Sequence, residues 1–144
     1  MRVDAIMTRD IQTATPGDTI QKAAALMDQL NVGALPVCDG GRLCGMITDR
    51  DITVRATSAG RSPHDCTVAD VMSVDVQYCY EDDELRDAAA HMKSLQVRRL
   101  PVVNRANELV GLVSLGDMAT RGGYGEAAET LRDVSNPSEP DRGH

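Results

Sequence analysis

The chain contains two copies of one sequence unit, and this repeat constrains the fold more than any other feature. Residues 3–37 align with residues 68–102 at an offset of 65, with 14 of 35 positions identical. After one inserted residue the offset becomes 66, and residues 43–51 then align with residues 109–117. A repeat of this length indicates a structural unit that buries its apolar face against a neighbour. We therefore expect two similar domains.

The repeat boundaries predict the division of the chain. We expect a first domain at 1–60, a linker at 61–67, a second domain at 68–121 and a flexible tail at 122–144, with a short helix over 126–134. A unit of about 60 residues is only marginally stable by itself. The two copies are therefore expected to pack together through their sheets.

Each copy is predicted as helix, strand, helix, strand, strand, helix, an α+β architecture. In the first copy we expect a helical turn at 3–7, strands near 11–13, 35–38 and 43–47, and helices at 19–30 and from 48 to about 58. In the second copy we expect helices at 84–95 and from 114, with strands near 99–103 and 108–113. Asp18 and Asp83 are the predicted N-caps of the two long helices. Pro36 favours an edge position or a strand start.

Composition excludes several classes of function. The 144 residues carry a net charge of −7 and include three Tyr, no Phe and no Trp. Stacking on single-stranded nucleic acid needs several aromatic side chains, and duplex binding needs a basic face. No stretch has the roughly 18 to 20 apolar residues of a membrane span. The first residues lack the apolar run of a signal peptide. We therefore expect a cytoplasmic protein that binds neither nucleic acid nor membranes.

The sequence contains no recognisable catalytic or metal-binding motif. Its three His residues lie in unrelated contexts, and its four Cys residues form no CxxC pair. We predict no catalytic residue and no metal site. Cys38 and Cys44 flank a predicted turn at 39–42, and they could face each other across two strands. A redox-sensitive pair of thiols is therefore an open alternative.

One chemical pattern occurs in both copies, namely Gly, two apolar residues, Thr or Ser, two further residues and Asp. The first copy has it at 45–51 and the second at 111–117. The hydroxyl residue ends a predicted strand and can cap the following helix. An ionised Asp only accepts hydrogen bonds, so Asp51 and Asp117 suit the two cis hydroxyls of a ribose. The pattern thus has a structural explanation and a ligand-binding one.

With these motifs the chain resembles the CBS domain family over about residues 3–120. The resemblance rests on Ile6-Met7-Thr8, on the Leu-Pro-Val runs at 35–37 and 100–102, and on the motif just described. Two such domains resemble a Bateman module, and we expect the small stand-alone class found in bacteria, without a fused enzyme. The resemblance implies a pseudo-twofold pair packed through its sheets, with two clefts that bind adenine nucleotides or related adenosyl ligands.

The resemblance also implies roles for individual residues. In one cleft, Asp117 would bind the ribose hydroxyls, Ser114 the ribose or phosphate, and Arg98 and Arg99 the phosphate. The adenine edge would be read around Thr8, Ile11 and Val32. The second cleft would use Thr48, Arg50 and Asp51, with the base among Ser73, Val76 and Val97.

The two clefts are not equivalent in charge. Gly33 and Ala34 stand where the second copy has Arg98 and Arg99. Guanidinium groups bind phosphate through charge-assisted, often bidentate hydrogen bonds. We therefore expect the Asp117 cleft to bind a phosphorylated ligand more tightly.

The function that this resemblance implies is regulatory and not enzymatic. The expected ligand is an adenine nucleotide, with AMP first and ADP, ATP, NAD or S-adenosylmethionine as alternatives. The module is expected to form a homodimer and to act in trans on a regulated protein. The competing hypothesis is a structural or stress-response interaction module with empty clefts, redox-sensitive through Cys38 and Cys44.

Overall fold

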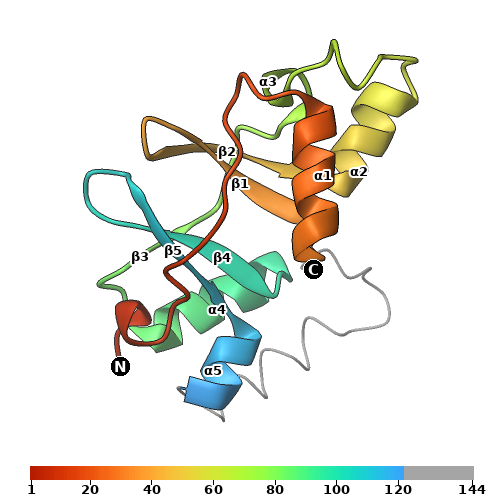
Figure 1. Cartoon of the computed structure of the whole chain (residues 1–144). Coiled ribbons are helices and arrows are strands. Elements are labelled where there is room, and N and C mark those ends of the chain that lie inside the picture. Colours follow the sequence, from red (N-terminus) through yellow and green to blue (C-terminus); the bar gives the residue numbers. More distant parts are fainter. Residues whose placement is uncertain (122–144) are drawn as a thin grey trace. The chain divides into compact units, whose positions relative to one another are not determined.

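Each half of the fold is completed by a segment from the start of the other sequence repeat. The computed structural model describes residues 1–121 (Figure 1), so the expected tail and its helix lie outside the described part. Residues 12–76 form one unit, which we call the Asp51 unit. Residues 1–11 and 77–121 form the other, which we call the Asp117 unit. The packing units thus exchange the first residues of the two sequence copies.

The Asp51 unit contains one antiparallel strand pair and the helices around it. Its elements are α1 (Ile20–Leu30), β1 (Ala34–Asp39), β2 (Arg42–Thr48), α2 (Asp49–Asp51), η2 (Ile52–Thr57) and α3 (Val68–Val71). The pairing of β1 with β2 shifts register between Val37 and Cys38. Figure 1 shows α1 alongside this strand pair, on which it buries Ile20, Ala23 and Met27. The predicted α1, β1 and β2 are confirmed.

The Asp117 unit repeats this arrangement with a three-stranded sheet in the order β3-β4-β5. Its elements are η1 (Val3–Ala5), β3 (Cys79–Tyr80), α4 (Leu85–Leu95), β4 (Arg99–Val103), β5 (Leu109–Ser114) and α5 (Leu115–Arg121). β3 is parallel to β4, and β5 is antiparallel to it. The mixed helix and strand composition of both units confirms the predicted α+β class.

Backbone hydrogen bonds hold each exchanged segment in place, and they correspond between the two units. We call residues 1–11 and 66–76 the leading segments. In the Asp51 unit, Met46 and Ser73 exchange two bonds of 3.0 and 2.9 Å. In the Asp117 unit, Leu112 and Thr8 exchange two bonds of 2.9 and 2.8 Å. Each leading segment therefore extends the sheet of its unit by a single bridge at the outer edge.

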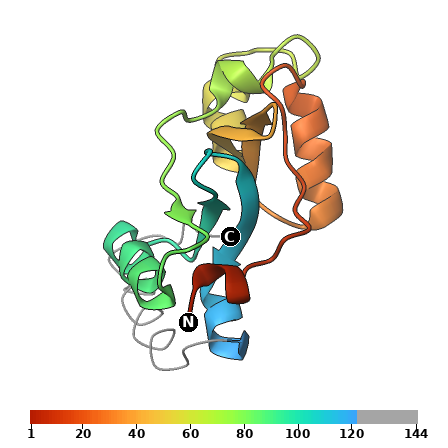
Figure 2. The same ribbon diagram turned by 90° about the vertical axis from the view of Figure 1, so that its left-hand side faces the viewer.

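The leading segments also contribute side chains to the two cores. Val3, Ile6 and Met7 belong to the buried cluster of the Asp117 unit, together with residues of α4, β4, β5 and α5. Figure 2 shows η1, drawn in red, in the same part of the molecule as α4 and α5 of that unit. Cys66, Val68 and Val71 take the corresponding role in the Asp51 unit. Both cores consist of aliphatic, Met, Ala and Cys side chains, because the chain has almost no aromatic residues.

The two predicted helix caps are each wrong by one residue. Thr19 is the N-cap of α1 and accepts a 3.1 Å bond from the Lys22 amide, and Glu84 is the N-cap of α4. The Asp18 carboxylate instead accepts from the Thr15 amide at 2.9 Å, and Asp83 accepts from the Tyr80 amide at 2.9 Å. Both Asp residues therefore close the turn that precedes the helix, a role that their short side chains also favour.

The strand expected near 11–13 is also wrong. Only Ala14 reaches β1, where it bridges Val37. Pro36 lies on β1 of a two-stranded sheet, which agrees with the edge position expected for it, whereas Pro101, its counterpart in the repeat, lies on the central strand β4. β3 begins opposite Val102, so it does not extend to a position where the absent N–H of Pro101 would be needed.

The helix expected from 48 to about 58 begins as predicted but changes type. α2 covers one turn, and η2 continues it as a π-helix in which the Ser58 amide donates to the Thr53 carbonyl at 2.9 Å. Such wide turns are uncommon and occur frequently at functional sites. Within residues 1–121, no helix is long and apolar enough to cross a membrane.

The close approach of each leading segment to its sheet requires a glycine. A Cβ atom at Gly111 would lie 2.7 Å from the Thr8 carbonyl oxygen, and one at Gly45 would lie 2.9 Å from the Ser73 carbonyl oxygen. We predict that Gly111→Ala lowers the free energy of unfolding by about 1 to 3 kcal/mol, because the segment must shift. Urea denaturation measures this loss.

The matched control is Gly17→Ala. A Cβ atom at Gly17 would meet nothing within 4 Å, so this variant is expected to keep or slightly raise stability. Equal stability of Gly111→Ala and the wild-type protein would contradict the close docking of the leading segment.

Candidate functional site

The recurring motif forms a capping box at the strand-to-helix junction of each unit. In the Asp51 unit, the Thr48 amide donates to Asp51 Oδ2 and the Asp51 amide donates to Thr48 Oγ1, both at 3.0 Å. In the Asp117 unit, the Ser114 amide donates to Asp117 Oδ2 at 3.0 Å and the Asp117 amide donates to Ser114 Oγ at 3.1 Å. The motif therefore caps a helix in each unit, as the structural explanation predicted.

The capping role leaves hydrogen-bond acceptor positions available on both Asp carboxylates. In both boxes the Asp carboxylate accepts through its Oδ2 atom. Asp51 Oδ1 lies 3.9 Å from Arg55 Nε. An ionised carboxylate has roughly four acceptor positions, so one oxygen can complete the cap while the other accepts from a ligand hydroxyl. The capping box and ribose binding are thus compatible at the same residue.

Arg98 and Arg99 lie next to the capping box of the Asp117 unit. The Arg98 carbonyl accepts a 2.9 Å bond from the Leu115 amide in the first turn of α5. Arg99 begins β4 and pairs in register with Ser114. Its Nε atom is buried and has no hydrogen-bond partner within the described part of the chain. A buried guanidinium N–H without a partner is costly, so this donor suits an added acceptor.

The corresponding position of the Asp51 unit has no such cations. There the Gly33 carbonyl accepts from the Asp49 amide at 2.9 Å, and Ala34 pairs in register with Thr48. The backbone geometry is therefore the same in both units, while the guanidinium groups belong to one of them. Arg50 is exposed, and its own amide donates to the Asp49 carboxylate at 2.8 Å.

The structure divides the predicted binding residues between the two units. The Asp117 unit holds Thr8, Ile11, Arg98, Arg99, Ser114 and Asp117, and the Asp51 unit holds Val32, Thr48, Arg50 and Asp51. Thr8 has an exposed side chain, and its backbone is fixed on Leu112. Val32 is half-buried against the core of the Asp51 unit, and Val97 packs in the same way in the Asp117 unit.

Sequence reasoning missed Arg55. Its Nη1 atom donates to the Val71 carbonyl at 3.2 Å and to the Met72 carbonyl at 3.4 Å, and its Nε faces Asp51. The spacing of four residues from Asp51 was a signal, because residues four apart lie on one helix face. The contact with α3 could not be predicted from the sequence, because it depends on the exchange of the leading segments.

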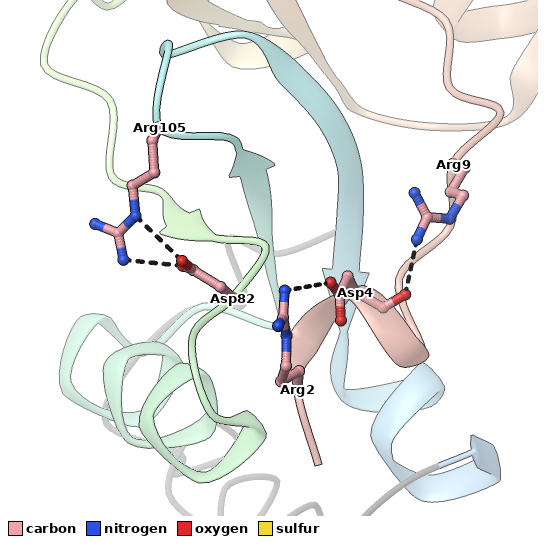
Figure 3. A network of polar contacts seen from close by, with 5 residues as sticks. All are labelled: Arg2, Asp4, Arg9, Asp82 and Arg105. Carbon is pink, nitrogen blue, oxygen red and sulfur yellow. Dashed lines mark hydrogen bonds and ion pairs between the residues drawn. The ribbon is translucent and has the colours of Figure 1, made fainter.

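A separate polar network stabilises the surface of the Asp117 unit (Figure 3). Arg105 makes two hydrogen bonds to Asp82, at 2.9 and 3.3 Å, and stacks 4.0 Å over the Tyr80 ring. The adjacent guanidinium of Arg105 lowers the pKa of Asp82. In the leading segment, Arg2 donates to the Asp4 carboxylate and Arg9 to the Asp4 carbonyl. The charged side chains of this surface are thus partnered by one another or by backbone groups, and no ligand is needed to account for them.

Cys38 and Cys44 do not lie directly opposite each other. The register shift in the β1–β2 pairing places Leu43 opposite Cys38 and leaves Cys44 as the extra residue. Cys44 donates to the Val37 carbonyl at 3.4 Å. Burial raises the pKa of Cys38 to about 11, that of Cys44 above its usual value, and that of Cys79 to about 12. The thiolates needed for redox chemistry are therefore scarce at neutral pH.

The described residues contain no group of three or more His, Cys, Asp or Glu side chains that could hold a metal ion. Together, the two units define a class of protein: a tandem repeat of small α+β domains, each with a Ser/Thr–Asp capping box at the end of a strand.

The chain belongs to the CBS domain family. The family model for the CBS domain matches residues 3–56 and 68–122. The chain is 46% identical over 131 residues to the CBS domain-containing protein YhcV of Bacillus subtilis, covering 90% of this chain and 92% of the relative.

Solved structures support the same assignment. Hypoxic Response Protein I, crystallised with two coordinated zinc ions, superposes with a TM-score of 0.75 at 32% identity, covering 84% of this chain and 98% of the other. The CBS domain pair of protein MJ0100, in complex with 5-methylthioadenosine and S-adenosyl-L-methionine, superposes with a TM-score of 0.69 at 28% identity, covering 83% and 93%.

The raised thiol pKa values predict slow alkylation. At pH 8 a thiol of pKa 11 is only about 0.1% thiolate, so iodoacetamide should label native Cys38 and Cys79 far more slowly than the protein unfolded in urea. Mass spectrometry after timed quenching measures the rates. Comparable native and unfolded rates at pH 8 would contradict this prediction.

The same shifts have a consequence for stability. The folded pKa of Cys38 lies above the ordinary value of 9.0, so the folded state favours the protonated thiol. This contribution to stability is complete below about pH 9 and is lost as the pH rises toward 11.

Proposed function

We propose that this CBS domain pair is a regulatory module that binds an adenine nucleotide or a related adenosyl ligand. The observation that carries the proposal is the arrangement in the Asp117 unit. There a carboxylate with a spare oxygen lies on the helix that follows β5, and a buried guanidinium N–H without a partner lies on the paired strand β4. The ligands of the MJ0100 domain pair support an adenosyl compound.

The ribose is proposed to bind at Asp117. The Asp117 carboxylate is half-buried and held by the Ser114 amide and hydroxyl, both at 3.0 Å. These bonds fix its orientation before a ligand arrives, which reduces the entropy lost on binding. Two cis hydroxyls of a ribose can then donate to the carboxylate. Thr8 and Ile11 belong to the same unit, and they are proposed to contact the base.

The phosphate is proposed to bind at Arg98 and Arg99, where charge-assisted hydrogen bonds favour an anion. AMP is therefore the first candidate, ahead of ADP, ATP, NAD and S-adenosylmethionine. A second, weaker site is proposed at Thr48, Arg50 and Asp51, because Gly33 and Ala34 supply no cation there. The module is further proposed to form a homodimer and to act in trans on a regulated protein.

A thermal-shift series tests the ligand class. AMP, ADP, ATP, NAD and S-adenosylmethionine are each added at millimolar concentration, with GMP and inorganic phosphate as controls. Binding to the folded state raises stability by about 2.7 kcal/mol at one hundred times Kd. We expect at least one adenosyl compound to raise Tm by several degrees, with smaller effects from the controls. No shift with any adenosyl compound would overturn the proposed function.

Calorimetry tests the asymmetry between the two sites. Asp117→Asn retains an acceptor for the cap but removes the charge, and Asp51→Asn is its matched counterpart in the other unit. We expect Asp117→Asn to weaken AMP binding by about 1 to 3 kcal/mol, the scale of one charged hydrogen bond or two. Asp51→Asn should leave the tighter binding step unchanged. Equal losses in the two variants would contradict the asymmetry.

A further inference from the structure

Arg55 makes three contacts that connect two parts of the Asp51 unit. Its Nη1 atom lies 3.2 Å from the Val71 carbonyl and 3.4 Å from the Met72 carbonyl. Its Nε atom lies 3.9 Å from Asp51 Oδ1. The first two contacts reach the leading segment 66–76, and the third reaches the carboxylate proposed to bind ribose. One guanidinium therefore joins a segment contributed by the second sequence copy to the ligand site of the first.

The contacts with α3 have a clear physical basis. α3 is a single turn, and its last carbonyls have no intrahelical partner. A cationic donor near a helix C-terminus satisfies such carbonyls and interacts favourably with their partial negative charge. Arg55 is oriented by these two acceptors, because a planar guanidinium that bonds through Nη1 has a restricted direction for Nε.

The contact with Asp51 affects the atom that a ligand would use. The capping box commits Asp51 Oδ2 to the Thr48 amide, so Oδ1 is the oxygen left for a ligand hydroxyl. The Asp51 side chain is 13% exposed and that of Arg55 is 53% exposed, so the pair is half inside the unit. When α3 is docked, the fixed guanidinium faces Oδ1. When α3 is undocked, this restraint on the carboxylate is lost.

We propose that Arg55 is a positioning residue that couples ligand binding at Asp51 to the docking of residues 66–76. The coupling rests on the proposed function of the Asp51 site. It is reciprocal by linkage, so a ligand held by Asp51 stabilises the docked segment to the same extent that docking favours the ligand. The π-helical turn of η2 supplies the geometry, because Arg55 lies within its widened backbone. The site can thereby report occupancy through the stability with which residues 66–76 are docked.

Hydrogen exchange with AMP as the probe tests the coupling. In the wild-type protein, saturating AMP should slow amide exchange in residues 66–76 by about threefold or more, on the scale of an exposed charge contact. Arg55→Met keeps the aliphatic stem and removes the donors, so it should abolish this AMP-dependent slowing in 66–76. Arg55→Lys restores a charge and should recover part of it.

Arg61→Met is the matched control. Arg61 also contacts the leading segment, through a 3.1 Å bond to Asp70, and within the described residues it makes no hydrogen bond or ion pair with Asp51. This variant should speed basal exchange in 66–76 and retain the AMP-dependent slowing. If Arg61→Met abolishes the slowing as fully as Arg55→Met, Arg55 acts only as a structural contact and the proposal is overturned.

A ligand-free double-mutant cycle separates this inference from the proposed function. Asp51→Asn should speed exchange in 66–76 by about threefold in the wild-type background and have no such effect in the Arg55→Met background. Additive effects would overturn the coupling even if AMP binds. Absence of AMP binding together with a non-additive cycle would overturn the proposed ligand while supporting the link between Asp51 and the segment.

Discussion

The reciprocal docking of the two leading segments is the interaction on which the remaining structure depends. The first residues of each sequence copy extend the sheet formed by the other copy and join its core. The Thr8–Leu112 and Met46–Ser73 backbone pairs bring the segments onto the sheets. Gly45 and Gly111 permit the close approach, and the buried Val, Ile and Met side chains of the segments then fill the two cores.

The residues of the proposed ligand site also stabilise the fold. The capping boxes at Thr48–Asp51 and Ser114–Asp117 start helices directly after the strands onto which the leading segments dock. A carboxylate that caps a helix has a fixed direction, and it retains acceptor capacity on its second oxygen. Arg55 adds a direct contact between the leading segment and one of these carboxylates. A regulatory module can use such shared residues, because a ligand that binds the carboxylate also acts on a group that stabilises the fold.

Much of the fold and part of the candidate site followed from the chain alone. The repeat predicted two copies of one unit, and the spacing between the hydroxyl residue and Asp predicted the capping boxes at 48–51 and 114–117. These features are local, so neighbouring residues suffice to define them. The N-caps were wrong by one residue, because Asp18 and Asp83 can cap a helix or close the turn before it, and both uses suit Asp. The edge position expected for Pro36 agrees with its two-stranded sheet, whereas its counterpart Pro101 lies on a central strand, where the short length of β3 removes the need for an N–H.

The two long helices, the antiparallel strand pairs, the aliphatic cores and the charge difference between the two junctions were determined by the amino-acid pattern, because periodicity, capping and charge act over a few residues. The partner of each leading segment was decided only in three dimensions. Residues 1–11 and 66–76 resemble each other, and their sequence does not state which sheet edge each one joins. That choice depends on hydrogen bonds between residues far apart in the chain. It also turned Arg55 from a charged residue on a helix face into a contact between a docked segment and Asp51.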